Sequence, residues 1–249
     1  MNEKQSPDAF RAAADGALAE MRALFAPTPL QLNDHLSARL GARIWLKRED
    51  LSPVRSYKIR GAFNFIRKAL EGEFIDIRLT GDFFDICYAS ALDFAAAEGA
   101  LMAPPFDHDD IIEGQATVAA EFSAQLPEGE KPDLVVLPVG GGGLSAGVAR
   151  YLEGQVANER VKLSKIDNFV DGAAVAQVGA RNFEILRRFR ADQVLIVPEN
   201  AICLTMTTIL NTEGIVLEPA GALSLAALEA LGADRLAGKS VVAVVSGGN

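Results

Sequence analysis

The chain has 249 residues and a formal net charge of −9 at pH 7, from 24 Lys and Arg against 33 Asp and Glu. This acidic balance argues against a dedicated nucleic-acid surface, which requires clustered positive charge. Hydrophobic residues make up 49% of the sequence, enough for a packed core in one large domain or two modest ones. No apolar run reaches the length of about 18 residues that a membrane-spanning helix needs.

Cysteine and histidine are too few for the commonest structural and catalytic sites. Cys87 and Cys203 lie far apart without a Cys-x-x-Cys spacing, which argues against a disulfide framework and a cysteine-rich zinc site. The only histidines are His35 and His108, so paired-histidine metal sites and Ser-His-Asp triads are disfavoured, and no metal is expected. The first ten residues are acidic and lack the apolar segment of a secretory signal. These features predict a cytoplasmic protein in a reducing compartment.

The pattern of apolar residues predicts strands that alternate with helices. Ser6 and Pro7 are residue types that favour a helix N-cap and the first helical position, so a helix is expected to begin there. The predicted helices cover residues 7–25, 31–40, 61–70, 82–97, 111–125, 144–152, 173–188, 199–211 and 222–231. The predicted strands cover residues 43–47, 73–79, 101–103, 134–139, 194–197, 215–217 and 240–245. Such alternation is typical of a parallel sheet with helices on both faces.

Four consecutive glycines, Gly140 to Gly143, separate the apolar strand at 134–139 from the helix that begins at Leu144. The free backbone N–H groups and the positive end of the helix dipole make such a junction suitable for binding phosphate. Because glycines lose much conformational entropy on folding, a run of them favours phosphate binding over a simple flexible turn. The run is not a Walker A loop, since no Lys-Ser or Lys-Thr pair follows it, and it is not a G-x-G-x-x-G motif.

Four further segments have open interpretations from residue type alone. Lys58 follows a Lys-Arg-Glu-Asp stretch, and neighbouring cations can activate a lysine as a nucleophile, although most lysines are solvated charges. Ser246 follows the last strand, where open α/β sheets bind ligands, but the sequence Ser-Gly-Gly-Asn also favours a turn. Glu218 follows a strand as well, and either faces that crevice or has a capping or turn role. The acidic run from Asp107 to Asp110 marks a helix start more simply than a metal site.

Together, these motifs resemble those of fold-type-II pyridoxal-phosphate enzymes, the class with the tryptophan synthase β fold. The resemblance covers the cofactor-lysine segment, the phosphate cradle and the pyridine-binding segment, at residues 47–51 (KREDL) with 56–62 (SYKIRGA), 138–147 (PVGGGGLSAG) and 244–249 (VVSGGN). Further stretches look most like those of threonine dehydratases (threonine ammonia-lyases), at residues 72–76, 105–107 and 114–117. The resemblance runs from about residue 29 to residue 249, and the principal motifs occur in the family's order.

The resemblance implies an α/β fold with two domains. The large domain, with a parallel sheet, would comprise residues 1–45 and 121–249, and the smaller α/β domain, which is incomplete here, residues 46–120. Lys58 would hold pyridoxal phosphate as a Schiff base and act as the general base. Ser246 would bind the pyridine nitrogen. The phosphate would be bound by the backbone amides of Gly140, Gly141, Gly142, Gly143 and Leu144.

The implied reaction is the elimination of water from L-threonine, which yields 2-oxobutanoate and ammonia in isoleucine biosynthesis. L-serine would be a second substrate and yield pyruvate. A serine at the pyridine nitrogen does not enforce a protonated ring, which favours prompt loss of the β-hydroxyl group over transamination. The family further implies a homo-oligomer, either a dimer or a tetramer. The expected ligand is a small amino-acid substrate, and no binding to a nucleic acid or a membrane is expected.

Several alternatives stay open at this point. Serine racemase and β-hydroxyaspartate dehydratase share all of the cofactor motifs. A catalytically inactive protein that retains pyridoxal phosphate or another phosphate ligand would also keep them. A nucleotide-binding domain that uses Gly140 to Gly143 is a weaker alternative, because no acidic ribose-binding residue stands at a convincing spacing.

The sequence departs from the family between the cofactor lysine and the glycine run. The family has a Ser-Ala-Gly-Asn-His loop that grips the substrate carboxylate, and no Asn-His pair occurs in this sequence. Several tens of family residues are missing around 68–71, and a second gap is expected near 155–157. We favour the interpretation that the sequence joins stretches of a longer chain. The alternative is a true deletion with very low activity, which would expose buried polar groups at about 1–3 kcal/mol each.

Overall fold

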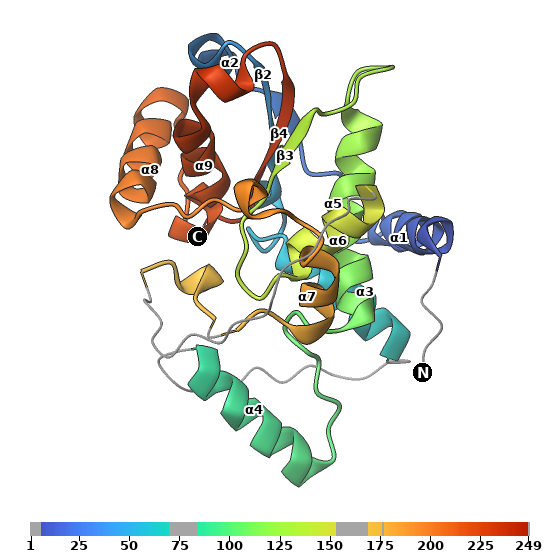
Figure 1. The fold of residues 1–249 in the computed structure, drawn as a ribbon. Helices are drawn as coiled ribbons and strands as arrows, with labels where there is room; N and C mark the ends of the chain where they lie inside the picture. Colours follow the sequence, from blue (N-terminus) through green and yellow to red (C-terminus); the bar gives the residue numbers. More distant parts are fainter. Residues whose placement is uncertain (1–5, 70–83, 153–168, 176, 249) are drawn as a thin grey trace.

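The computed structural model describes residues 6–69, 84–152, 169–175 and 177–248 (Figure 1). The strand predicted at 73–79 and the gap expected near 155–157 lie outside these ranges, and the gap expected around 68–71 falls at the end of the first range. The assignment of residues 1–45 and 121–249 to a large domain and 46–120 to a small one stays a prediction. No helix within the described ranges has the length and apolar character needed to cross a bilayer.

A four-stranded sheet of order β1-β2-β4-β3 lies at the centre of the protein (Figure 1). Its strands are β1 (Leu30–Leu32), β2 (Arg43–Arg48), β3 (Leu134–Val136) and β4 (Ser240–Val245). The strands β2, β4 and β3 are parallel to one another, and β1 pairs with β2 in the antiparallel sense. Every residue of β4 is buried, as expected for the central strand of a covered parallel sheet. The strands predicted near β2, β3 and β4 are therefore confirmed.

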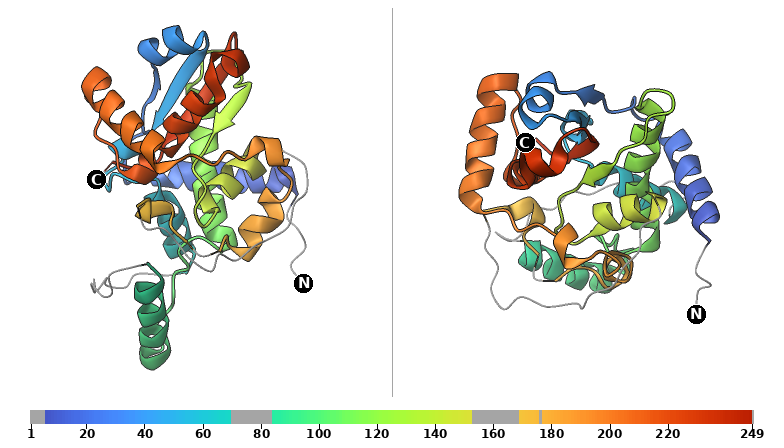
Figure 2. Two further views of the ribbon diagram at one scale, coloured as in Figure 1. Left: turned by 60° about the vertical axis from the view of Figure 1, so that its left-hand side comes forward. Right: turned by 45° about the horizontal axis from the view of Figure 1, so that its top comes forward.

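Helices cover both faces of this sheet (Figures 1 and 2). Alternate residues of β4 point to opposite faces, so Val241, Ala243 and Val245 join one apolar cluster while Val242 and Val244 join another. The first cluster packs against α2, α8 and α9, and the second against α5 and α6. The helices are α1 (Pro7–Met21), α2 (Asp34–Leu40), α3 (Lys58–Ala69), α4 (Phe84–Glu98), α5 (Asp109–Gln125), α6 (Gly143–Leu152), α7 (Ala180–Leu186), α8 (Glu199–Glu213) and α9 (Pro219–Leu236). Short 3-10 turns occupy Glu49–Leu51, Asp171–Ala173 and Ala191–Gln193.

Capping residues explain where several of these helices begin and end. The Ser6 hydroxyl accepts a hydrogen bond from the Ala9 backbone N–H (3.2 Å), which confirms the predicted cap of α1. The helix predicted from residue 31 begins later, because residues 30–32 pair with β2 as an edge strand. The Asn33 side chain then caps α2 by accepting a hydrogen bond from the Leu36 N–H (2.7 Å).

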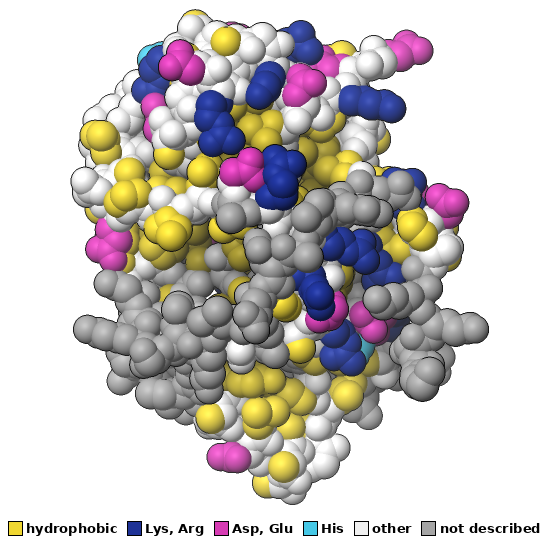
Figure 3. All heavy atoms as spheres, in the orientation of Figure 1, with side chains coloured by type: hydrophobic (Ala, Val, Ile, Leu, Met, Phe, Trp, Pro, Cys, Tyr) yellow, Lys and Arg dark blue, Asp and Glu magenta, His cyan; other side chains and the backbone are white. Residues whose placement is uncertain are grey.

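The strands predicted at 101–103, 194–197 and 215–217 do not form in the structure. These segments are apolar, but a strand also needs a neighbouring strand for its backbone groups, and they pair with no strand of the described sheet. Ile196 has 93% of its surface exposed, the largest value among the described large apolar side chains. Hydrophobic side chains also gather on the surface beside α8 and over α4, which projects away from the sheet (Figures 2 and 3).

Glycines let three of the helices cross at very short distance. A Cβ atom at Gly114 of α5 would lie 2.5 Å from the carbonyl oxygen of Arg60 in α3. A Cβ atom at Gly147 of α6 would lie 2.5 Å from the carbonyl oxygen of Ile112 and 2.7 Å from the backbone nitrogen of Ala116 in α5. Because these neighbours are backbone atoms of packed helices, they cannot move aside cheaply.

We predict that Gly147→Ala lowers the free energy of unfolding by about 1–3 kcal/mol, because the added methyl group forces α5 and α6 apart. Gly16→Ala in α1 is the matched control, since no atom lies within 4 Å of its Cβ position. This control should raise stability by about 0.5–1 kcal/mol through lower entropy of the unfolded chain. Urea unfolding curves of both variants measure the difference, and a Gly147→Ala protein as stable as the wild type would contradict the close crossing.

Candidate active site

The residues predicted to bind the cofactor's aldehyde and its ring nitrogen, Lys58 and Ser246, are brought together at the carboxyl end of β4. Lys58 is the first residue of α3, and Ser246 directly follows β4. The backbone N–H of Tyr57 donates a hydrogen bond to the Ser246 carbonyl oxygen (3.1 Å), and the N–H of Gly248 donates to the Arg55 carbonyl oxygen (3.1 Å). These bonds join the segment before Lys58 to the segment that contains Ser246.

A tight turn precedes Lys58 and directs the chain into α3. Arg55 has a φ of 56°, and within the described part of the chain no other non-glycine residue has a positive φ. The Ser52 hydroxyl accepts a hydrogen bond from the Ser56 N–H (2.9 Å) and donates one to the Ser56 carbonyl oxygen (3.0 Å). Lys58 itself is exposed, so its side chain is accessible to a ligand at this edge of the sheet.

Ser246 and Glu218 lie on the other side of this junction. Ser246 is buried, and its hydroxyl donates a hydrogen bond to the carbonyl oxygen of Ala220 in the first turn of α9 (3.2 Å). Glu218 precedes α9 without capping it through its side chain, and the carboxyl group lies so close to Gly247 that a Cβ atom there would collide with it. Of the two interpretations of Glu218 from the sequence, the crevice position is therefore the one the structure supports.

The pKa of the Glu218 carboxyl is raised from its usual value. Burial is the main cause, the charge of Asp171 adds to the rise, and the charge of Lys58 opposes it. The Glu218 carboxyl is therefore within the electrostatic influence of the Lys58 amine. A lysine, a buried hydroxyl group and a carboxyl group thus share one edge of the sheet.

The glycine run lies at the same edge. It connects β3 to α6, and β3 pairs with β4 through Val136 opposite Ala243, so the loops that follow the two strands are adjacent. Gly142 has a φ of 90°, which L side chains rarely adopt. Gly140 and Gly141 approach Ala173 and the ring of Phe106 so closely that a Cβ atom at either position would collide. These glycines therefore have a packing and conformational role besides any contact with a ligand.

The arrangement fits pyridoxal phosphate. The first residues of α6 have N–H groups without partners inside the helix, which suits an anion such as the cofactor's phosphate. Lys58 can react with an aldehyde, and the Ser246 hydroxyl can bind a ring nitrogen. The close approach of Gly247 to Glu218 and of Gly221 to the Gly247 carbonyl oxygen leaves no room for larger side chains around Ser246.

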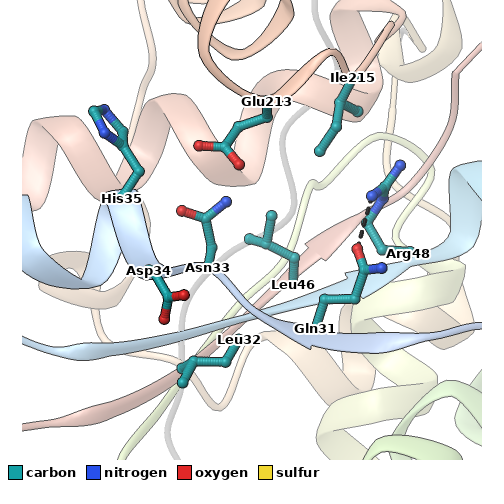
Figure 4. Close-up of a pocket in the computed structure, with 9 residues that line it drawn as sticks. All are labelled: Gln31, Leu32, Asn33, Asp34, His35, Leu46, Arg48, Glu213 and Ile215. Carbon is teal, nitrogen blue, oxygen red and sulfur yellow. Dashed lines mark hydrogen bonds between the residues drawn. The ribbon is translucent and has the colours of Figure 1, made fainter.

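A separate groove of about 750 Å³ is lined by β1, β2, the start of α2 and the end of α8 (Figure 4). Its Arg48 side chain donates a hydrogen bond to the Gln31 side chain (2.8 Å) and forms a bidentate pair with Asp50. None of the predicted cofactor residues lines this groove, whose lining comprises Gln31, Leu32, Asn33, Asp34, His35, Leu46, Arg48, Glu213 and Ile215. His108 likewise lies outside the candidate site and caps α5 by accepting a hydrogen bond from the Asp110 N–H (3.2 Å).

Sequence reasoning missed a buried ion network beneath Lys58. Arg60 is fully buried and donates two hydrogen bonds of 2.8 Å to the carboxylate of Glu49. The same guanidinium also pairs with Glu121, whose carboxylate accepts a hydrogen bond from Lys47 Nζ (2.7 Å). The available signal was the placement of Lys47 and Glu49 at the end of a largely apolar strand, and of Arg60 two residues after Lys58. This network ties the first turn of α3 to β2 and α5.

Burial within this network lowers the pKa of Lys47 to about 8, while the charges of Glu121 and Glu49 oppose the shift. In the unfolded chain the lysine has its usual pKa of 10.5. Below pH 8 the cost of burying the ammonium is present in full. Between pH 8 and 10.5 the unfolded state binds more protons than the folded state, so this lysine's contribution to stability rises with pH.

We therefore predict that the free energy of unfolding of the wild type, relative to that of Lys47→Met, rises between about pH 7 and about pH 10. The variant has no ammonium group at this position, so its free energy of unfolding has no contribution from the titration of Lys47. Urea unfolding of both proteins at several pH values measures the difference between them. Parallel pH profiles of the two proteins would show that Lys47 is not buried as the structure places it.

Comparison with known proteins shows the family to which this chain is related. The family model for the pyridoxal-phosphate dependent enzymes matches residues 21–77 and 73–247. The chain belongs to this family. The chain is 36% identical to the L-threonine dehydratase biosynthetic IlvA of Mycobacterium tuberculosis (strain CDC 1551 / Oshkosh), over 94% of this chain and 71% of that relative. It is also 36% identical to the protein of the same name from Bacillus subtilis (strain 168), over 89% and 68%.

Solved structures of similar proteins share the architecture. The processed form of threonine deaminase isoform 2 from Solanum lycopersicum superposes with a TM-score of 0.83 at 27% identity, covering 98% of this chain and 90% of that one. A second threonine deaminase, from T.th., has a TM-score of 0.78 at 28% identity, covering 96% and 97%. Serine racemase from Dictyostelium discoideum, at 21% identity and a TM-score of 0.80 over 96% and 98%, shares the fold. The predicted fold-type-II class, the similarity to threonine dehydratases and the pyridoxal-phosphate dependence of the family are confirmed.

The comparisons also bear on the missing segments. The matches to the mycobacterial relatives run over 308 aligned positions, more than the 249 residues of this chain, so those relatives contain internal residues that the chain lacks. The two stretches matched by the family model meet at residues 73–77, close to the gap expected around 68–71. The prediction that family residues are missing from the chain is therefore confirmed.

Proposed function

We propose that this chain is a pyridoxal-phosphate dependent ammonia-lyase that converts L-threonine to 2-oxobutanoate and ammonia and accepts L-serine as a second substrate. The observation that carries the proposal is the direct backbone pairing of the Lys58 segment with the Ser246 segment, in a chain 36% identical to named threonine dehydratases. A cytoplasmic location and a homo-oligomeric state, as in the sequence interpretation, belong to the same proposal.

Each site residue has a defined role in this proposal. When bound, pyridoxal phosphate supplies a conjugated ring that accepts the electron pair from the substrate α-carbon. Lys58 holds the cofactor through its side-chain amine and, once released, takes the α-proton at Nζ as the general base. The Ser246 hydroxyl, which donates a hydrogen bond to the Ala220 carbonyl oxygen (3.2 Å), would lie at the ring nitrogen, and a hydroxyl group does not force that nitrogen to stay protonated. The phosphate is held by the backbone amides of Gly140, Gly141, Gly142, Gly143 and Leu144.

Glu218 adds a counter-charge to this set. Its carboxyl group interacts electrostatically with Lys58 and lies against Gly247, beside the Ser246 backbone. An ionised carboxylate there stabilises the positive charge that Lys58 gains when it takes the α-proton. Because burial raises the pKa of Glu218, this group is also able to hold a proton at a higher pH than an exposed glutamate.

A second candidate function is pyridoxal-phosphate binding without turnover. It is favoured by one observation, the absence of any Asn-His pair in the sequence, since the family loop with these residues grips the substrate carboxylate. Under this alternative the cofactor residues keep their roles, while the substrate lacks the contacts that orient its α-proton toward Lys58.

The first test is covalent trapping of the cofactor. The protein is mixed with pyridoxal phosphate, reduced with borohydride and analysed by intact mass and peptide mapping. We expect one reduced adduct on Lys58 in the wild type and none in Lys58→Ala. Lys131→Ala, which removes an exposed lysine before β3, is the control and should retain the adduct. An adduct on a different lysine would overturn the assignment of Lys58.

The second test separates the two candidate functions. The cofactor-loaded protein is incubated with L-threonine or L-serine, and 2-oxobutanoate or pyruvate is measured. The ammonia-lyase proposal predicts release of these 2-oxo acids at a rate that falls by at least about 100-fold in Lys58→Ala, the usual effect of losing a general base. An adduct without any 2-oxo acid would favour the binding function, and formation of D-serine in its place would favour a racemase.

A further inference from the structure

Residues in and next to α7 form hydrogen bonds with the glycine run. The Asn182 side chain is fully buried, and its Nδ2 donates hydrogen bonds to the carbonyl oxygens of Gly141 (2.8 Å) and Phe106 (3.0 Å). The backbone N–H of Gly179 donates a second hydrogen bond to the Gly141 carbonyl oxygen (3.0 Å). Gly141 is therefore the point at which α7 and the glycine run are joined.

The segment around Phe106 contacts both α7 and the glycine run. The Asp107 carboxylate accepts hydrogen bonds from the backbone N–H groups of Ala180 and Arg181 (2.8 Å each), which anchors the start of α7. The Phe106 ring packs directly on Gly141, where a Cβ atom would collide with it. In Figure 1, α7 accordingly lies beside α6, the helix that begins at the end of the glycine run.

The orientation of the Asn182 amide is determined by its partners. Both partners of Nδ2 are carbonyl oxygens, so a flipped amide would place Oδ1 against two acceptors. Among the described residues, Oδ1 is buried without a hydrogen-bond partner, which costs free energy that an apolar residue of similar size would avoid. The two donated hydrogen bonds are therefore the feature of this side chain that an apolar replacement would lose.

The hydrogen bonds to the Gly141 carbonyl oxygen determine the direction of the Gly142 N–H. A peptide unit is planar and almost always trans, so its carbonyl and N–H bonds point in opposite directions. Because the Gly141 carbonyl is directed toward α7, the Gly142 N–H is directed away from α7. The φ of 90° at Gly142 holds the chain in this conformation as it enters α6.

We propose that Asn182 is a positioning residue of the phosphate cradle, which turns the Gly142 N–H toward the phosphate by holding the Gly141 carbonyl. This inference rests on the proposed function, in which the Gly142 amide is one of the phosphate ligands. Asn182 acts through Gly141 and has no contact with the cofactor or the substrate in this scheme.

The test compares pyridoxal phosphate with pyridoxal, which has the same aldehyde and ring but no phosphate. Affinities for both are measured by absorbance titration of the wild type, Asn182→Ala and Asn182→Asp. The preference for pyridoxal phosphate over pyridoxal should fall about tenfold in Asn182→Ala, the factor that corresponds to roughly one hydrogen bond. Asn182→Asp, which has no donor and repels both carbonyl oxygens, should lose at least as much.

The ratio of the two affinities distinguishes positioning from a general structural role. Both ligands bind only the folded protein, so a smaller folded fraction lowers both apparent affinities equally and leaves the ratio unchanged. Asn33→Ala is the matched control, because it removes another buried asparagine that bonds to the backbone, at the start of α2. Its ratio should equal that of the wild type.

Two outcomes would overturn the inference. If Asn182→Ala keeps the wild-type ratio, Asn182 does not position the cradle, while the proposed cofactor site stands. If the wild type itself binds pyridoxal as tightly as pyridoxal phosphate, the assignment of the glycine run to the phosphate fails, and the inference fails with it.

Discussion

The Arg60 guanidinium lies fully buried between the carboxylates of Glu49 and Glu121, and the position of Lys58 depends on this arrangement. Arg60 stands two residues after Lys58 in the first turn of α3, while Glu49 follows β2 and Glu121 belongs to α5. Removing one partner of such a group would leave a buried charge uncompensated, at a cost of about 3–5 kcal/mol. The cluster therefore specifies where α3 begins relative to the sheet, and with it where the Lys58 amine lies.

Close backbone approach is the second constraint on the site. Helices α3, α5 and α6 cross at glycines, and the loop between β3 and α6 packs at its glycines against Phe106 and Ala173. The same residue type thus performs two tasks, since it permits tight helix crossings and leaves backbone N–H groups accessible at the start of α6. The result is a closely packed scaffold around a loop made mostly of backbone, in which the Asn182 side chain donates a hydrogen bond to the Gly141 carbonyl oxygen.

Much of the fold was predictable because its signals are local. Helix-capping and helix-terminating residue types predicted α1, α8 and the start of α6. Continuous apolar runs predicted β3 and β4. The segments at 194–197 and 215–217 have the same apolar composition but form no strand, because strand formation depends on a neighbour that local sequence does not specify. The edge strand β1 was missed for the converse reason, since three residues paired with β2 have little periodicity of their own.

The sequence by itself determined the chemical types at the site: a lysine after a strand, a glycine run before a helix and a serine after the last strand. It also showed that the family's Asn-His loop is absent from this chain. Only the tertiary structure decided that the Lys58 and Ser246 segments share backbone hydrogen bonds, that Glu218 faces Gly247 and that Asn182 holds Gly141. The physical reason is the separation of the interacting residues along the chain. Motifs reflect local backbone requirements, whereas these contacts join residues that are far apart in the chain and meet only when the parallel strands align.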